Sequence, residues 1–111
     1  MDILFSDEKM KKRCTTHKTA VKTWGLESAN KLAQRLQDLQ SLSCLAEASA
    51  LPGKFHALSG DRHGQFAMRL VGGLRLVITP ANEPIATLLD GGIDLSKTTA
   101  IRVVDVEDYH D

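Results

Sequence analysis

The segment Gln65-Phe-Ala-Met-Arg-Leu-Val-Gly-Gly-Leu-Arg-Leu-Val-Ile-Thr79 decides the fold of this 111-residue chain. Its two halves are rich in apolar and β-branched residues, which favour strands. Gly72 and Gly73 between the halves are typical of the tight turn of a β-hairpin. We therefore expect two antiparallel strands, at Gln65 to Val71 and at Leu74 to Thr79.

The register of this hairpin depends on the length of its loop. If the two glycines alone form the loop, Arg75 lies opposite Leu70, whereas a three-residue loop changes the pairing. The two-residue loop places Arg75 on the face that also carries Phe66, Met68 and Val77.

Further strand-like runs lie on both sides of the hairpin, at Phe55 to Leu58 and at Ala100 to Val106. Residues 80 to 99 contain Pro84 and the pair Gly91-Gly92, and we expect them to form a long connection with at most a minor turn or hairpin. Long loops in compact domains are often functional or mobile.

The residues before Pro52-Gly53 indicate helices. A helix beginning at Leu26 is predicted by apolar residues that recur at steps of three and four, at Leu26, Ala29, Leu32, Ala33, Leu36 and Leu39. An earlier helix is expected over roughly residues 7 to 18, with Ser6 as its N-cap and acidic residues in its first turn. Residues 41 to 50 either extend the second helix or form another turn. A helical half is thus followed by a sheet half.

Length and composition predict a single domain over residues 1–111. No apolar stretch reaches the roughly 18 residues that a membrane span requires, and the chain begins with polar and charged residues. We therefore expect a cytoplasmic protein without a membrane anchor. Cys14 and Cys44 belong to no Cys-x-x-Cys pair and are expected to be reduced structural thiols.

The net charge is zero, but the charges are unevenly placed along the chain. Residues 1–56 carry nine Lys and Arg against six Asp and Glu, and residues 57–111 carry five against eight. The excess of positive charge forms a basic cluster that either contacts nucleic acid or is a solvated helix face. Its members are Lys9, Lys11, Lys12, Arg13, Lys18 and Lys22.

Two polar segments carry side chains suited to acid and base chemistry on a phosphoester. The first is His56-Ala-Leu-Ser-Gly-Asp-Arg-His-Gly64, and the second is Asp108-Tyr-His110 at the end of the last strand-like run. Cleavage of RNA through its own 2′-hydroxyl requires a base, an acid and a cation for the charge of the phosphorane.

His56 and His110 can supply the base and the acid, because imidazole exchanges protons near neutral pH. Arg75, with Arg62, can supply the cation. Asp108 is then expected to orient or charge a histidine, and Tyr109 to position the phosphate or stack on a base.

Other interpretations of the same residues remain open. Residues 60 to 64 also suit a simple turn, with Gly60 or Gly64 at positive φ. His56, His63, His110 and Asp108 are residue types that bind zinc, but their spacing matches no zinc motif, so we expect neither a metal nor a cofactor.

Three motifs together resemble a known family. They are Leu-Pro-Gly-x-Phe-His-x-Leu-x-Gly-Asp-Arg-x-Gly-Gln at 51–65, Leu-Arg-Leu at 74–76 and Glu-Asp-Tyr-His at 107–110. They are similar to the HigB branch of the RelE/ParE toxins, the killer proteins of plasmid-maintenance, type II toxin-antitoxin systems. The chain departs from that pattern at Ser59, where many members have lysine, and at Leu74, where an aromatic residue is common.

The resemblance implies an α+β, RelE-like fold in which two N-terminal helices pack on a small antiparallel sheet. It implies a ribosome-dependent mRNA endonuclease that acts without a metal. It also implies a cognate antitoxin, a HigA-like helix-turn-helix protein, through which alone the toxin reaches operator DNA. The family's catalytic residues match His56, Arg75, Asp108, Tyr109 and His110.

Two alternatives share this fold. One is a ParE-like toxin that binds a protein target, such as gyrase, without catalysis, and the other is a catalytically inactive, toxin-like regulator. A ParE-like toxin needs no pair of histidines, so the presence of His56 and His110 favours the endonuclease.

Overall fold

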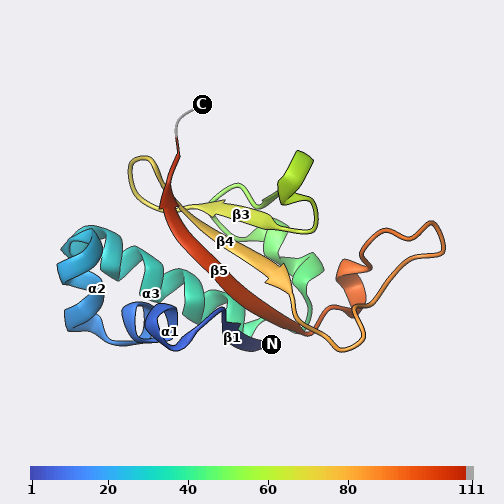
Figure 1. Ribbon diagram of the computed structural model, residues 1–111, viewed down its shortest axis with the longest axis horizontal. Coiled ribbons are helices and arrows are strands. Elements are labelled where there is room, and N and C mark those ends of the chain that lie inside the picture. The colour runs from blue at the N-terminus through green and yellow to red at the C-terminus, as the bar shows by residue number, and fades with distance from the viewer. Residues whose placement is uncertain (110–111) are drawn as a thin grey trace.

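Five strands form one sheet in the order β1-β5-β4-β3-β2 in this computed structural model, which describes residues 1–109 (Figure 1). His110 and Asp111 lie outside the described residues. The strands are β1 (Asp2–Phe5), β2 (His56–Ala57), β3 (Phe66–Arg69), β4 (Leu74–Pro80) and β5 (Ala100–Asp108). The four strands β2 to β5 correspond to the four predicted runs, with shorter or longer ends.

The sheet is mixed, and the prediction of a purely antiparallel sheet was wrong. The apolar residues at the start of the chain form β1, which pairs in parallel with β5 from Asp2 opposite Ala100 to Phe5 opposite Val103. The other three pairs of strands are antiparallel. A parallel pair needs a long crossover between its strands, which here includes the whole helical half of the chain.

Three α-helices, rather than two, precede the hairpin: α1 (Glu8–Thr15), α2 (His17–Trp24) and α3 (Leu26–Ser41). The predicted helix over residues 7 to 18 was wrong because the backbone is extended at Thr16, with φ −105° and ψ 109°. The adjacent β-branched Thr15 and Thr16 weaken a helix at this point. The N-cap is Asp7 instead of Ser6, and its carboxylate accepts a hydrogen bond of 2.7 Å from the Met10 amide.

The helix predicted from Leu26 onward is confirmed as α3, although its apolar stripe is only partly buried. Ala29, Leu32 and Leu39 are buried, whereas Leu26 is exposed. Residues 45–50 form a separate 3-10 helix, η1 (Leu45–Ala50), and two shorter ones are η2 (Gly60–Arg62) and η3 (Leu95–Lys97).

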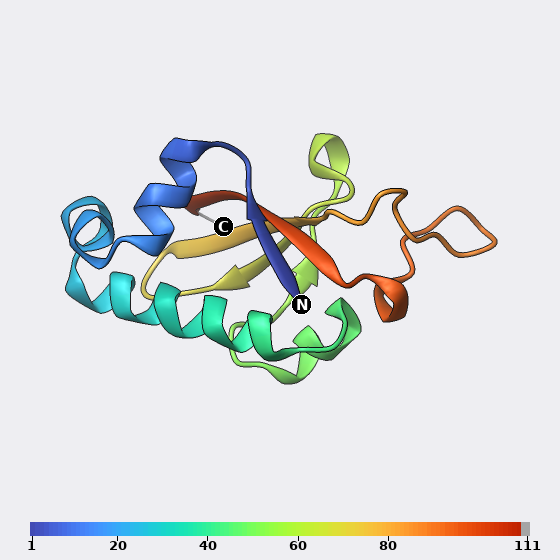
Figure 2. The ribbon, with the colours of Figure 1, turned by 90° about the horizontal axis from the view of Figure 1, so that it is seen from below.

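The hydrophobic core lies between one face of the sheet and the segments α1, α3 and η1 (Figures 1 and 2). From β4 it receives Leu74, Leu76 and Ile78, which alternate with Arg75 and Val77 along the strand. Alternate residues of a strand point to opposite faces, so Arg75 and Val77 face away from the helices. We call this second face of the sheet the distal face.

Cys14 on α1 belongs to this core, and Cys14 and Cys44 are both free thiols. Burial raises the pKa of the Cys14 thiol to about 12, against a smaller lowering by Arg13 and a further raising by Asp105. The thiol is therefore protonated and chemically inert near neutral pH, as a structural cysteine is.

The hairpin has a three-residue loop, Val71 to Gly73, so the structure selects the second of the two registers that the sequence left open. The amide of Leu70 donates to the carbonyl of Leu74 over 2.9 Å, and Arg69 is the partner of Arg75 across the pair. Arg75 therefore shares the distal face with Arg69 and not with Phe66 or Met68, which lie in the core.

Residues 81–99 form the predicted long connection between β4 and β5, which projects from one end of the sheet (Figures 1 and 2). It contains η3 and an isolated antiparallel bridge between Thr87 and Ile93. Within residues 1–109, no helix is long and apolar enough to span a membrane.

Candidate functional site

The register of the sheet places three charged residues in one row on the distal face. Arg69 on β3 is the partner of Arg75 on β4, and Arg75 is the partner of Glu107 on β5. Residues directly opposite each other on neighbouring strands have their side chains on the same face. This row therefore gathers two arginines and a carboxylate from three different strands.

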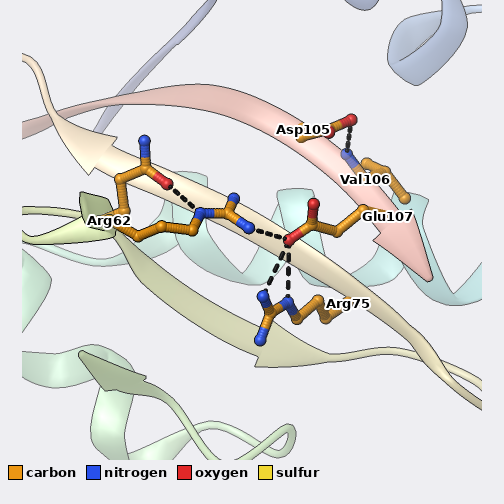
Figure 3. Close-up of polar contacts among 6 residues, drawn as sticks. Arg62, Arg75, Asp105, Val106 and Glu107 are labelled. Atoms are coloured by element: carbon orange, nitrogen blue, oxygen red, sulfur yellow. Dashed lines mark hydrogen bonds and ion pairs between the residues drawn. The ribbon is translucent and has the colours of Figure 1, made fainter. Parts of the chain in front are cut away.

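Glu107 binds two arginines through a single oxygen atom (Figure 3). Its Oε1 accepts a hydrogen bond of 2.7 Å from Nη1 of Arg62 and one of 3.0 Å from Nε of Arg75, while Nη2 of Arg75 also lies 3.0 Å away. The side chains of Arg62, Arg75 and Glu107 are 31%, 16% and 22% exposed, so the cluster is mostly shielded but remains accessible to solvent. We call these three residues the arginine–glutamate cluster.

Arg62 reaches this cluster from a turn outside the sheet. It ends η2, and its Nε donates to the Gln65 side chain over 3.0 Å, just before β3 begins. From there its side chain extends over β4 to Glu107 on β5 (Figure 3). The turn interpretation of this segment is also confirmed, since Gly60 and Gly64 have φ of 67° and 90°. The same residues thus form a turn and deliver a cation to the distal face.

The charge of the cluster is reflected in the pKa of Glu107. Partial burial by itself raises the pKa of this carboxyl, but hydrogen bonds and positive charge from Arg62 and Arg75 outweigh burial and hold it below the ordinary value of 4.5. Glu107 is therefore ionised near neutral pH and offsets part of the charge of the two arginines.

Tyr109 is a second contact of Arg75. The Cζ atom of Arg75 is 4.7 Å from the centre of the Tyr109 ring, a cation–π contact. The amide of Tyr109 also donates to the carbonyl of Gly73 over 2.9 Å, which ties the end of β5 to the hairpin loop. The guanidinium of Arg75 thus contacts both a carboxylate and an aromatic ring.

His56 lies on the distal face too, but at the far edge of the sheet. It is exposed on β2 and is the partner of Ala67, which is in turn the partner of Val77. Two inter-strand spacings and two residues along the strand separate it from Arg75, a Cα distance on the order of 12 Å for ordinary sheet spacings. Ala67 and Val77, which lie between His56 and Arg75 on this face, are fully buried.

The hydrogen bond of His56 defines which of its ring nitrogens is free. Its Nδ1 lies 2.8 Å from the carbonyl oxygen of Lys54, and because a carbonyl only accepts, Nδ1 carries the proton. In the neutral ring Nε2 is then an exposed acceptor, which is the state that a general base requires.

Asp108 is not gathered with the other candidate residues. It is the partner of Leu74, whose side chain lies in the core, so Asp108 points to the face opposite Arg75. Its side chain is exposed at the end of β5. Glu107 is the carboxylate that meets Arg75, and His110 lies outside the described residues.

The basic cluster lies on the helices and not on the distal face. Its first four members are on α1 and its last two on α2, and all are exposed except Arg13, which is half-buried. Because these helices pack against the core side of the sheet, the basic cluster and Arg75 form separate surfaces. Among residues 1–109, no three His, Cys, Asp or Glu side chains are placed to bind a metal ion together.

Two charged residues of the distal face, Glu107 and Arg69, were missed as site residues from the sequence. In the sequence, Glu107 is noticed only as the first residue of the terminal motif, and Arg69 only as one residue of a strand-like run. Both residues are identified by their position opposite Arg75 on neighbouring strands. That position can be assigned only when the loop length of the hairpin and the pairing of β4 with β5 are known.

The sequence matches no protein-family model and no curated protein. Solved structures share the fold over the whole chain. A YoeB/ParE toxin from Agrobacterium tumefaciens superposes with a TM-score of 0.62 at 12% identity, covering 99% of this chain and 100% of that chain. The YoeB-YefM complex from Staphylococcus aureus superposes with a TM-score of 0.59 at 17% identity. The YoeB dimer from the same organism superposes with a TM-score of 0.57 at 18% identity. In both cases 100% of this chain and 98% of the other is covered. The chain therefore has the fold of the YoeB/ParE toxins.

Proposed function

We propose that this chain is a toxin of a type II toxin-antitoxin system and acts as a ribosome-dependent mRNA endonuclease, a single toxin domain of the HigB branch. The arrangement of Arg62, Arg75 and Tyr109 on the distal face, with His56 on the same face, is the observation that supports an enzyme. The fold shared with YoeB/ParE toxins supports the assignment to a toxin.

The reaction proposed is attack of the RNA 2′-hydroxyl on the adjacent phosphorus. His56 removes the proton of the 2′-hydroxyl through Nε2, and His110 protonates the departing 5′-oxygen. Arg75 stabilises the charge that develops on the phosphorane oxygens, since a mostly shielded guanidinium interacts with an anion more strongly than one in water.

The remaining terminal residues have supporting roles in this proposal. Tyr109 holds Arg75 in place, and it either positions the phosphate or stacks its ring on a base. Asp108 points to the face opposite Arg75, so its proposed role is to orient or charge a histidine and not to contact Arg75. The mechanism uses no metal and no other cofactor.

The partners proposed follow from the same assignment. One of the similar structures is of a toxin bound to YefM, which supports a cognate antitoxin for this chain. We propose that the antitoxin is HigA-like and provides the only contact with operator DNA, and that the toxin meets ribosomes and mRNA in the cytoplasm. The basic cluster on α1 and α2 is the proposed ribosome contact.

One observation favours a second candidate, a ParE-like toxin that binds a protein target without catalysis. Glu107 neutralises part of the charge of Arg62 and Arg75, which a nuclease needs for phosphate. A toxin that only binds a protein has no such need.

Induced expression separates the two candidates. We expect the wild-type chain to arrest growth and His56→Ala or His110→Ala to relieve the arrest, because a general acid or base contributes about 10²- to 10⁴-fold to the rate. Soluble amounts of each variant, measured on the same cells, are the control. Full toxicity of both soluble variants would exclude the proposed catalysis and favour the ParE-like toxin.

A further inference from the structure

The carboxylate of Glu107 occupies the position that a phosphate oxygen would take between the two arginines. Its Oε1 is within 3.0 Å of one nitrogen of Arg62 and two nitrogens of Arg75. Guanidinium groups bind carboxylates and phosphates through the same charge-assisted, often bidentate hydrogen bonds. The two arginines therefore form an anion site that is already filled by a side chain of the same protein.

The construction of this site allows exchange. Glu107 is 22% exposed and Arg62 is 31% exposed, so a solvent anion can approach the cluster. Arg75 is fixed on the central part of the sheet and against Tyr109, whereas Arg62 comes from a short turn. Partly exposed ion pairs contribute little to stability because water competes for both partners. Displacing the carboxylate therefore has a low cost compared with displacing a fully buried one.

We propose that Glu107 is an internal competitor for the phosphodiester of single-stranded RNA, which binds to Arg62 and Arg75 only when the carboxylate leaves them. This inference rests on the proposed function, since it concerns the same two arginines. It assigns Glu107 a regulatory part in substrate binding, where neither the terminal motif nor the resemblance gave it a role. Substrate that is positioned by the ribosome has the additional binding energy to displace it, whereas free RNA does not.

The test is the affinity of purified protein for a short single-stranded RNA with 2′-O-methyl groups, which cannot be cleaved. Glu107→Gln keeps the shape and removes the charge, and we expect it to bind this RNA about tenfold more tightly than wild type at low, constant ionic strength, a gain of the size expected for a few partly exposed, charge-assisted contacts. Fluorescence anisotropy measures the affinity, and thermal unfolding confirms that the variant is folded.

Asp61→Asn is the matched control. It removes the same charge one residue from Arg62, but Asp61 is exposed, and the hydrogen bonds of the two arginines go to Gln65 and Glu107. We expect its RNA affinity to stay within about twofold of wild type, because charges in water are screened. A gain equal to that of Glu107→Gln would show that net charge, and not competition for the arginines, sets the affinity, and would overturn the inference.

Glu107→Asp is a second variant in case Glu107→Gln fails to fold. Aspartate keeps the charge but is one methylene shorter, so it contacts the two guanidinium groups less well, and we expect an affinity between those of wild type and Glu107→Gln. Unchanged or weaker RNA binding in the folded Glu107 variants would show that the carboxylate only organises the arginines. Because no cleavage is measured, failure of the proposed nuclease would be seen separately, as intact mRNA on ribosomes with wild-type protein.

Discussion

At the scale of single residues, the central side chain is Arg75. Its guanidinium is 16% exposed, contacts Glu107 through two nitrogens and lies 4.7 Å from the centre of the Tyr109 ring. A cation held by a carboxylate and an aromatic ring keeps one orientation, which is what stabilisation of a transient charge requires. These interactions also make this arginine difficult to replace with another cation.

We predict that Arg75→Ala lowers the rate of mRNA cleavage on programmed ribosomes by about 10²- to 10³-fold, the range for loss of one preorganised donor. Arg75→Lys should recover only a part of this loss, since an ammonium group lacks the planar fork that binds two oxygens. Single-turnover kinetics measures the effect, with thermal unfolding of each variant as the control. A lysine variant as fast as wild type would show that charge alone is needed.

The ion pairs of Glu107 with Arg62 and Arg75 predict that the free energy of unfolding depends on pH. Because Arg62 and Arg75 hold its pKa in the folded chain below the ordinary value of 4.5, unfolding takes up a proton in acid. The stabilisation is therefore complete above about pH 4.5 and is lost as the pH falls through the lower, folded pKa.

Urea unfolding of wild type and Glu107→Gln over a range of pH measures this contribution. We expect the difference in free energy of unfolding between the two proteins to be constant near neutral pH and to shrink as the pH falls below about 4.5. A difference that stays constant down to acidic pH would mean that Glu107 does not interact with the arginines in solution.

At the scale of elements, the local patterns were the ones that the sequence predicted well. The apolar period of α3 and the glycines of the hairpin act over a few residues, and both elements formed where expected. The break at Thr16 was missed because the charged residues of α1 and α2 leave only a short apolar pattern to each helix. The parallel pairing of β1 with β5 was missed because it joins strands from the two ends of the chain.

The candidate site was predictable in its residue types but not in its geometry. A one-residue difference in the hairpin loop separates Arg75 from Phe66 and Met68 and places it beside Arg69. The pairing of β4 with β5 also shifts between Val77 and Ile78, so alternation read from the sequence does not give the face of each residue in β5. Asp108 was grouped with Arg75 because the resemblance matched it to a catalytic acid, whereas the register places Glu107 opposite Arg75.

The basic cluster is a property of α1 and α2, and it predicts where ribosomal RNA binds. We expect the double variant Lys11→Glu/Lys12→Glu to bind the ribosome more weakly and with a smaller dependence on salt. The slope of log affinity against log salt concentration should decrease by about 0.7 to 0.9 for each phosphate that the variant no longer binds. The exposed Lys31 and Lys97, both reversed to Glu in one protein, provide a control with the same change in charge. If the affinity of the two double variants falls equally, the effect belongs to net charge and the cluster is a solvated helix face.

At the scale of the whole molecule, two surfaces of different character lie on opposite sides of one sheet. The helical layer carries an excess of positive charge, while the distal face offers arginines that are partly neutralised by Glu107. Although the net charge is zero, the molecule therefore has a basic surface on its helices and a candidate site in which Glu107 partly neutralises two arginines. In the proposed function, the first surface binds the ribosome and the second acts on the mRNA.

The most direct test of the central claim is the chemistry of the RNA ends produced by purified protein on preassembled, programmed ribosomes. Attack by the 2′-hydroxyl predicts upstream fragments that end in a 2′,3′-cyclic phosphate or its 3′-phosphate product, and no fragments with His110→Ala. Downstream fragments that carry a 5′-phosphate would indicate attack by water and contradict this mechanism, and intact mRNA under conditions where the protein is bound would contradict the assignment as a ribosome-dependent nuclease.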